Sequence, residues 1–198
     1  MNVLIGCEFS GTVRDAFLEY GHNAYSCDLL PSESSRGPHI QGDVRLALRK
    51  RSWDLFIGHP SCTYLCNSGV CHLHTQPGRW DLMREGALFF LELLNAEVPR
   101  VAIENPIMHK YAVEIIGRRQ DQVIQPYQFG HPERKATCLW LRNLPKLKPT
   151  NIVPLPTVKS QAQRLHWLPP SADRWKERSK TFPGIAQAMA AQWGKLLK

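Results

Sequence analysis

The sequence lacks any long apolar run. No segment approaches the roughly 20 consecutive apolar residues that a membrane-spanning helix needs. The opening stretch, MNVLIGCEF, also lacks the basic region and the sustained apolar stretch of a secretory signal peptide. These absences exclude a membrane partner and predict a cytoplasmic protein.

Acidic residues are scarce relative to basic ones. There are 17 Asp and Glu residues against 25 Lys and Arg residues, which gives a formal net charge of +8. A positive field of this kind attracts polyanions, and nucleic acid is the commonest one inside cells. The charge therefore predicts a nucleic-acid partner, with an ordinary basic surface as an equal alternative.

Regular cysteine spacing is also missing. The six cysteines fall at irregular intervals, and a cytoplasmic protein keeps its thiols reduced. This pattern excludes a disulfide framework and predicts free thiols or metal ligands. The length of 198 residues and the hydrophobic fraction of 43% fit one globular domain that buries its own core.

Apolar runs alternate with helical patterns in the first part of the chain. We expect strands at 3–5, 24–28, 53–57, 100–104, 122–126 and 137–141, and helices at 13–20, 80–96 and 107–116. This alternation predicts an α/β fold with a Rossmann-like, doubly wound, mostly parallel sheet. Ligands of such sheets bind outside the carboxyl ends of the strands.

The chain divides into three parts by composition. Residues 1–142 contain the alternating pattern, whereas residues 143–180 are rich in proline and show little periodicity, which predicts an irregular excursion. Residues 181–198 predict a helix that packs back on the sheet.

Acidic residues follow the first strands. The turn Gly6–Gly11 joins a strand to a helix, and Asp28 ends the next strand, which is the generic arrangement for binding a nucleoside. Glu8 would repel a pyrophosphate, so a ligand with an amine or sulfonium cation fits better. Asp43 follows a glycine, and its carboxylate is suited to accept from an adenine amino group. A turn without any ligand remains the alternative.

Cys62 and Glu104 each follow an apolar strand, which predicts that they meet at one edge of the sheet. A thiolate beside a carboxylic acid is what covalent activation of a pyrimidine requires, because sulfur adds to C6 while the acid stabilises the ring nitrogen. The alternative is a structural free cysteine, the commonest fate of a single Cys.

Further soft ligands follow Cys62 in the chain, namely Cys66, Cys71, His72 and His74. Their spacing lacks the paired knuckle of common zinc sites, and zinc binding by Cys62 would exclude its use as a nucleophile. We therefore expect no metal, with a zinc site as the alternative, and we expect a mobile loop that closes over the base.

An ordered series of motifs resembles the cytosine-C5 DNA methyltransferase family, most of all its short bacteriophage members. The motifs are Glu8–Gly11, Cys27–Asp28, Gly42–Val44, Asp54–Cys62, Ile103–Asn105, Phe129–Lys135 and Gly184–Ala190. The resemblance covers roughly 2–142 and 181–196, and implies the S-adenosylmethionine-dependent methyltransferase fold, with 1–142 as the catalytic core. Residues 143–180 are much shorter than the recognition domain of that family.

The resemblance also implies roles for individual residues. Cys62 would be the nucleophile, Glu104 would contact the ring nitrogen of a flipped cytosine, and Asn105 belongs to the same motif. Asp28 would bind the ribose of S-adenosylmethionine and Asp43 its adenine. The other implied cofactor-binding residues are Glu8, Phe9, Ser10, Gly11 and Pro60, with Phe9 or Cys7 in the place of the aromatic residue that stacks on adenine.

DNA is the implied substrate, in the cytoplasm of a host cell if a bacteriophage encodes the protein. Arg134 and Lys135 of the basic motif, and Trp167 and Arg174 of the proline-rich segment, are candidate DNA contacts; ordinary surface residues are the alternative. Thr137 stands where the family has an arginine that touches the base. The expected activity is methylation of cytosine C5 in DNA. The same fold acting on RNA or a free pyrimidine nucleotide, transfer of another one-carbon group, and an inactive nucleic-acid-binding protein remain open.

Overall fold

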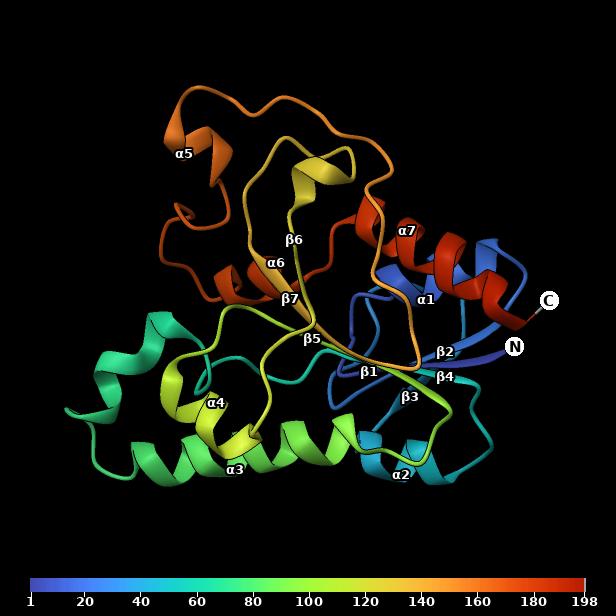
Figure 1. Cartoon of the computed structure of the whole chain (residues 1–198), viewed down its shortest axis with the longest axis horizontal. Coiled ribbons are helices and arrows are strands. Elements are labelled where there is room, and N and C mark those ends of the chain that lie inside the picture. Colours follow the sequence, from blue (N-terminus) through green and yellow to red (C-terminus); the bar gives the residue numbers. More distant parts are fainter. Residues whose placement is uncertain (198) are drawn as a thin grey trace.

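Within residues 1–197, which the computed structural model describes, seven strands form one sheet (Figure 1). The strands are β1 (Asn2–Gly6), β2 (Asn23–Asp28), β3 (His39–Gln41), β4 (Leu55–Gly58), β5 (Arg100–Asn105), β6 (Gln122–Ile124) and β7 (Thr137–Arg142). Lys198, at the end of the predicted last helix, lies outside the described residues. No helix in the described part of the chain is long and apolar enough to cross a membrane.

The strand order is β3-β2-β1-β4-β5-β7-β6. Strands β1 to β5 run parallel, whereas β7 is antiparallel to both β5 and β6. The central strands β1 and β4 are apolar and almost wholly buried, as parallel strands covered on both faces should be. The predicted doubly wound, mostly parallel α/β sheet is confirmed.

Helices cover both faces of the sheet (Figure 1). On one face lie α1 (Thr12–Glu19) and α7 (Pro183–Trp193), which pack against each other and bury Phe17, Met189 and Trp193. On the other face lie α2 (Val44–Arg49), α3 (Arg79–Leu94) and α4 (Lys110–Ile116). The second core includes an edge-to-face contact between Phe90 and Trp140, with ring centroids 4.9 Å apart.

Some element predictions were wrong in extent. The helix predicted at 107–116 begins only at Lys110, because the His109 side chain accepts a hydrogen bond from the backbone N–H of Ala112 and caps the helix. Strand β3 and helix α2 were not predicted. Residues 183–197 form a helix that changes to the 3-10 helix η3 (Gly194–Leu197).

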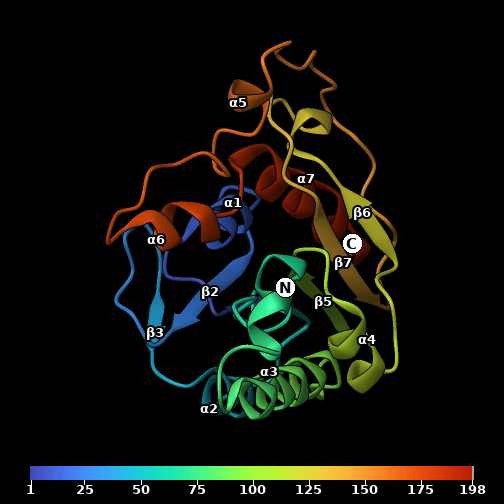
Figure 2. The same cartoon turned by 90° about the vertical axis from the view of Figure 1, so that its left-hand side faces the viewer.

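Residues 143–180 are irregular apart from two short helices, α5 (Lys159–Ala162) and α6 (Arg174–Ser179). Sequence analysis did not predict α6. Figure 2 looks onto the carboxyl ends of the parallel strands and shows α6 crossing in front of α1, close to this edge. Because β7 is antiparallel, the residues just before it reach the same edge.

Candidate active site

A cavity of about 1110 Å³ lies at the carboxyl edge of the sheet. Residues that follow β1 to β5 line it, together with residues just before β7. The 3-10 helix η1 (Asn67–Leu73) and residues 163–181 form further walls. The cavity therefore lies where the switch in strand order between β1 and β4 predicts a ligand.

The charge of the lining residues changes sign across the sheet. In strand order, the acidic residues Asp43, Asp28 and Glu8 come first. Cys62 and Glu104 follow in the middle, after β4 and within β5. The basic residues Arg134 and Lys135 precede β7 at the other end. Arg45 also lines the acidic half and pairs with Asp43, but the three carboxylates outnumber it. This half therefore suits a cationic ligand, and the other half an anionic one.

Glu8 caps helix α1. Its carboxylate accepts hydrogen bonds from the backbone N–H groups of Val13 at 2.6 Å and Arg14 at 3.3 Å. Burial raises the pKa of Glu8, and the charge of His59 and these two hydrogen bonds oppose the rise. Gly11, with φ of 74°, makes the turn but does not line the cavity, whereas Glu8 and its neighbours Phe9 and Ser10 do.

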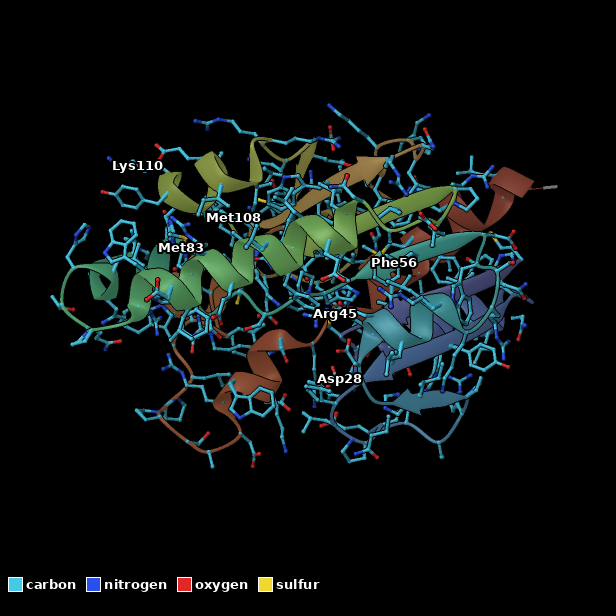
Figure 3. The ribbon with its side chains drawn as sticks, turned by 90° about the horizontal axis from the view of Figure 1, so that it is seen from below. Asp28, Arg45, Phe56, Met83, Met108 and Lys110 are labelled. Carbon is cyan, nitrogen blue, oxygen red and sulfur yellow. The ribbon has the colours of Figure 1, made fainter. Side chains whose placement is uncertain are left out.

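Asp28 and Asp43 lie on neighbouring turns of the acidic half. One oxygen of Asp28 accepts from the backbone N–H of Leu30 at 3.0 Å. Asp43 caps α2 by accepting from the backbone N–H of Arg45 at 2.8 Å, and it also faces the Arg45 guanidinium at 3.6 Å. Figure 3 shows Asp28 and Arg45 close together on one side of the molecule, with Lys110 far away.

Cys62 lies at the start of a tight turn after β4. Its carbonyl oxygen accepts from the backbone N–H groups of Leu65 and Cys66, at 3.0 and 3.1 Å. The Asn105 amide donates to the carbonyl of Pro60 at 2.8 Å and so ties the end of β5 to the loop that carries Cys62. Asn105 is 1% exposed, which indicates a positioning role.

The thiols of Cys62 and Cys66 share a hydrogen bond. This bond, burial, and the charges of Cys66 and Glu104 raise the pKa of Cys62. The same bond lowers the pKa of Cys66 to about 5, against the effect of burial, and hydrogen bonds from Ser68 and the backbone N–H of Gly69 lower it further. The Cys66 sulfur lies 2.9 Å from the Ser68 hydroxyl. Ionisation of one thiol therefore opposes ionisation of the other, and burial and Glu104 add to the rise in the pKa of Cys62.

Glu104 is paired with His59, which sequence analysis did not single out. The imidazole Nδ1 lies 3.1 Å from Oε2 of Glu104, and the two side chains are 8% and 15% exposed. Burial alone would raise the pKa of Glu104. The hydrogen bond to His59 and the charges of His59 and Lys135 hold it below its usual range. A polar residue between Gly58 and Pro60, directly after a buried strand, was the available sequence signal.

Lys135 lies beside Glu104, but its amine is already engaged. Nζ donates to the carbonyl oxygens of Arg178 at 2.7 Å and Lys180 at 3.3 Å. Burial lowers the pKa of Lys135, while the charges of Glu104 and Cys62 oppose that change. Lys135 thus fastens the end of α6 to the cavity wall, and the exposed Arg134 lines the same wall.

Three contacts hold the segment around α6 over the cavity. Trp175 packs on Phe9 with ring centroids 5.9 Å apart, and Lys180 pairs with Glu33 at 2.9 Å. Lys135 supplies the third contact, and neither Trp175 nor Lys180 was predicted as a site residue.

Two of the predicted DNA-contacting residues lie elsewhere. Trp167 and Arg174 do not line the cavity: Trp167 is 58% exposed, and Arg174 donates to the carbonyl of His166. The predicted catalytic residues and the predicted cofactor-binding residues except Gly11 all line it.

Among residues 1–197, no group of three or more His, Cys, Asp and Glu residues is arranged to hold a metal ion. The segment after Cys62, expected as a loop, forms η1. Within it Cys71 is exposed, and Nδ1 of His72 faces the Gln76 amide at 3.3 Å.

Buried Arg14 organises the wall next to Asp28. Its guanidinium donates to the hydroxyls of Ser26 and Ser32 and to the carbonyl of Ser34, and it pairs with Asp15 at 2.8 Å. It thereby fixes the loop after β2, whose first residues line the cavity. Sequence analysis did not identify this role, because the three serine partners lie 12 to 20 positions away.

No protein-family model matches the chain, and a search of curated proteins gives no match. Among solved structures, the chain is similar to a prophage-encoded E. coli protein described provisionally as a DNA modification methyltransferase. The identity is 15% and the TM-score 0.49, over 85% of this chain and 55% of that one. It is also similar to the methyltransferase EhMeth of Entamoeba histolytica, at 15% identity and a TM-score of 0.44, over 77% and 57% of the two chains.

WbdD, solved with a kinase inhibitor, is similar at 12% identity and a TM-score of 0.40, over 74% of this chain and 39% of that one. The chain spans a little over half the length of the first two proteins. These likenesses concern the arrangement of sheet and helices and carry no conclusion about activity.

Proposed function

We propose that the protein transfers a methyl group from S-adenosylmethionine to C5 of cytosine in DNA through a covalent adduct with Cys62. The observation that carries the proposal is that Cys62 and Glu104 line one cavity, between an acidic half and a basic half. A cationic donor and a polyanionic substrate would then meet at the two residues that activate the base.

The acidic half fits S-adenosylmethionine by its chemistry. The carboxylates of Asp28 and Asp43 are suited to ribose hydroxyls and an adenine amino group, and Phe9 and Trp175 offer aromatic faces. The buried carboxylate of Glu8 occupies the N-terminus of α1, the position that a pyrophosphate would need. When bound, the cofactor supplies an electrophilic methyl group.

The remaining chemistry belongs to this chain. The Cys62 thiolate adds to C6 of a cytosine turned out of the helix, and a proton from Glu104 reaches N3, so that C5 becomes nucleophilic. After C5 is methylated, the C5 proton passes to water, the C6–S bond breaks and the thiolate departs. The aromatic ring is restored as N3 returns its proton to Glu104. The hydrogen bond to Cys66, burial and the charges of Cys66 and Glu104 raise the pKa of Cys62. A cation bound nearby would stabilise the Cys62 thiolate and so oppose this rise.

Cysteine substitutions test this proposal. DNA that contains 5-fluorocytosine should trap the wild-type protein when S-adenosylmethionine is present. Fluorine replaces the C5 hydrogen that must be removed before the thiolate can depart, so the covalent adduct persists. The measurement is a protein–DNA band on a denaturing gel. Cys62→Ser should give no band and keep its thermal unfolding curve. The matched control, Cys71→Ser, should form the adduct because Cys71 is exposed and does not line the cavity. Equal loss in both variants would contradict the proposal.

A second candidate is methylation of a free pyrimidine nucleotide or of RNA. The observation that favours it is that residues 163–181, from the short segment in the place of a recognition domain, form a wall of the cavity. Transfer of tritiated methyl groups to DNA, RNA or nucleotides, measured side by side, separates the substrates. Cofactor binding without transfer to any of them would favour an inactive binding protein.

A further inference from the structure

His59 lies between two buried carboxylates. Its Nδ1 is 3.1 Å from Oε2 of Glu104 on β5. From the other side, its charge lowers the pKa of Glu8, which lies in the turn after β1. The backbone N–H of His59 donates to the carbonyl of Gly6 at 2.9 Å, which fixes the residue between β1 and β5. His59 therefore connects the turn before α1 to the residue that would hold the base.

The second imidazole nitrogen is ready for a ligand. The side chain is 8% exposed and lines the cavity, and Nε2 is buried without a hydrogen-bond partner among the described residues. A buried polar atom of this kind is costly unless something satisfies it. This orphaned atom is independent of the Glu104 contact and also indicates a functional rather than a purely structural histidine.

The proposed chemistry requires a proton that Glu104 does not hold at rest. Its pKa is kept below the usual range, so the carboxyl group is ionised near neutral pH. Protonation of the pyrimidine N3 therefore needs a nearby acid that can recharge the carboxylate. Cytosine N3 becomes more basic only as the Cys62 sulfur adds to C6.

The other titratable groups around the pair are poor donors. Lys135 faces Glu104 from the segment before β7, but its amine donates to two backbone carbonyls. The Cys62 thiol must lose its own proton to act. Burial and the charge of Glu104 raise the pKa of Cys138 to about 11, and Glu8 already accepts hydrogen bonds from α1. His59 is therefore the remaining proton donor in hydrogen-bond contact with Glu104.

We propose that His59 is a positioning residue that holds Glu104 and carries the proton that Glu104 delivers to the base. This inference rests on the proposed function. The donor in this step is the imidazolium form of His59, with a hydrogen on each ring nitrogen, and donation from Nδ1 leaves neutral imidazole with its hydrogen on Nε2. As the base is attacked, the Nδ1–H bond breaks, a proton bonds to Glu104, and the carboxyl group passes a proton to N3. When the thiolate departs, N3 returns the proton along the same path, so none is consumed.

The pH dependence of methyl transfer tests the inference in His59→Asn. An amide can still hydrogen-bond to Glu104 but cannot lend a proton, so Glu104 must then be protonated itself. The alkaline limb of the rate profile should move to lower pH, because a carboxyl group loses its proton at lower pH than an imidazolium ion does. Near neutral pH the rate should fall about 100-fold. Cofactor affinity and thermal unfolding should stay as in the wild type.

Two further measurements separate a proton carrier from a structural residue. Added imidazole should restore part of the activity of His59→Ala. The control variant His74→Asn, whose exposed side chain does not line the cavity, should keep the wild-type profile. An unshifted profile in His59→Asn, or an equal loss at every pH, overturns the inference.

The proton-carrier inference and the proposed function can also fail separately. A carbon NMR titration of the Glu104 carboxyl group distinguishes the two failures, because it measures the pKa of Glu104 without any methyl transfer. The pKa of Glu104 should rise in His59→Asn, because the charge of His59, which helps to hold it down, is gone. If the wild type transfers no methyl group to any substrate while this rise is seen, the proposed function fails and the coupling of the pair stands. No rise overturns the inference.

Discussion

At the scale of single residues, Arg14 is the clearest case of a charge held inside the protein. It is wholly buried and bonds to Asp15, two serine hydroxyls and a backbone carbonyl. A buried ion pair contributes little net stability compared with an apolar pair, but removal of one partner leaves the other unpaired and is costly.

We expect Arg14→Met to lower the free energy of unfolding by about 3–5 kcal/mol. Methionine fills much of the volume but removes the guanidinium that Asp15 and the serines bind. Denaturation by urea, followed by circular dichroism, measures the change. The matched control is Arg36→Met, because Arg36 pairs with Glu19 in an exposed setting and should change little. Similar effects of the two variants would show that the buried network is not what stabilises the loop.

Site residues that lie directly after a strand or in a turn could be predicted from the sequence, but the residues that they contact could not. Cys62, Glu104, Asp28 and Asp43 were predicted as site residues because apolar strands or glycine turns precede them. His59 was missed because its importance depends on contact with Glu104, 45 positions away. Such a contact depends on strand order, which local patterns do not specify.

At the scale of elements, the approach of α7 to the sheet depends on a glycine. A Cβ at Gly184 would collide with the carbonyl oxygen of Phe129. The backbone N–H of Gly184 donates to Nε2 of His131 at 2.9 Å. Burial lowers the pKa of His131, which keeps the ring neutral and able to accept this bond.

Gly184→Ala should therefore destabilise the protein by about 1–3 kcal/mol, because the first turn of α7 must move away from Phe129. Gly86→Ala is the control. Gly86 lies inside α3, and its nearest neighbour to a new Cβ is Leu65 at 3.5 Å, an ordinary contact. Alanine there should stabilise the helix by about 1 kcal/mol. Thermal unfolding of the two variants should shift in opposite directions, and a shift in the same direction would contradict this account.

Elements with a strong periodic pattern were predicted and short ones were not. The helix expected at 80–96 is α3 (Arg79–Leu94), and the first strands differ by a residue or two. In contrast, β3 has three residues and exists through pairing with β2. Helix α6 buries no residue and is held by contacts of Trp175 and by bonds from Lys135 to the residues at its end, so its own sequence carried no signal.

At the scale of the whole molecule, the effect of the net charge of +8 on a bound polyanion depends on where the basic residues lie. The basic end of the cavity includes Arg134, which is exposed, whereas the acidic end lies across the sheet. Contacts between lysine or arginine and phosphates release counterions and make binding depend on salt.

DNA binding should weaken as salt rises, with a linear relation between the logarithms of affinity and salt concentration. Arg134→Gln should reduce the slope by about 1, as expected for one lost phosphate contact. Fluorescence anisotropy of labelled DNA measures both. Lys195→Gln is the control, because Lys195 is exposed in η3, does not line the cavity, and should leave the slope unchanged. A slope that does not respond to Arg134→Gln would remove this residue from the DNA contact.

The two ends of the fold have a practical consequence for handling the protein. Strand β1 begins, and α7 ends, on the side of the sheet away from α5 and α6 (Figure 1). A reporter domain or a surface linker joined at either terminus would therefore stand behind the sheet and leave the mouth of the cavity open to large molecules. Because the first strand begins close to where the last helix ends, a short linker could join residues 1–197 into a ring, which could then be opened at another loop.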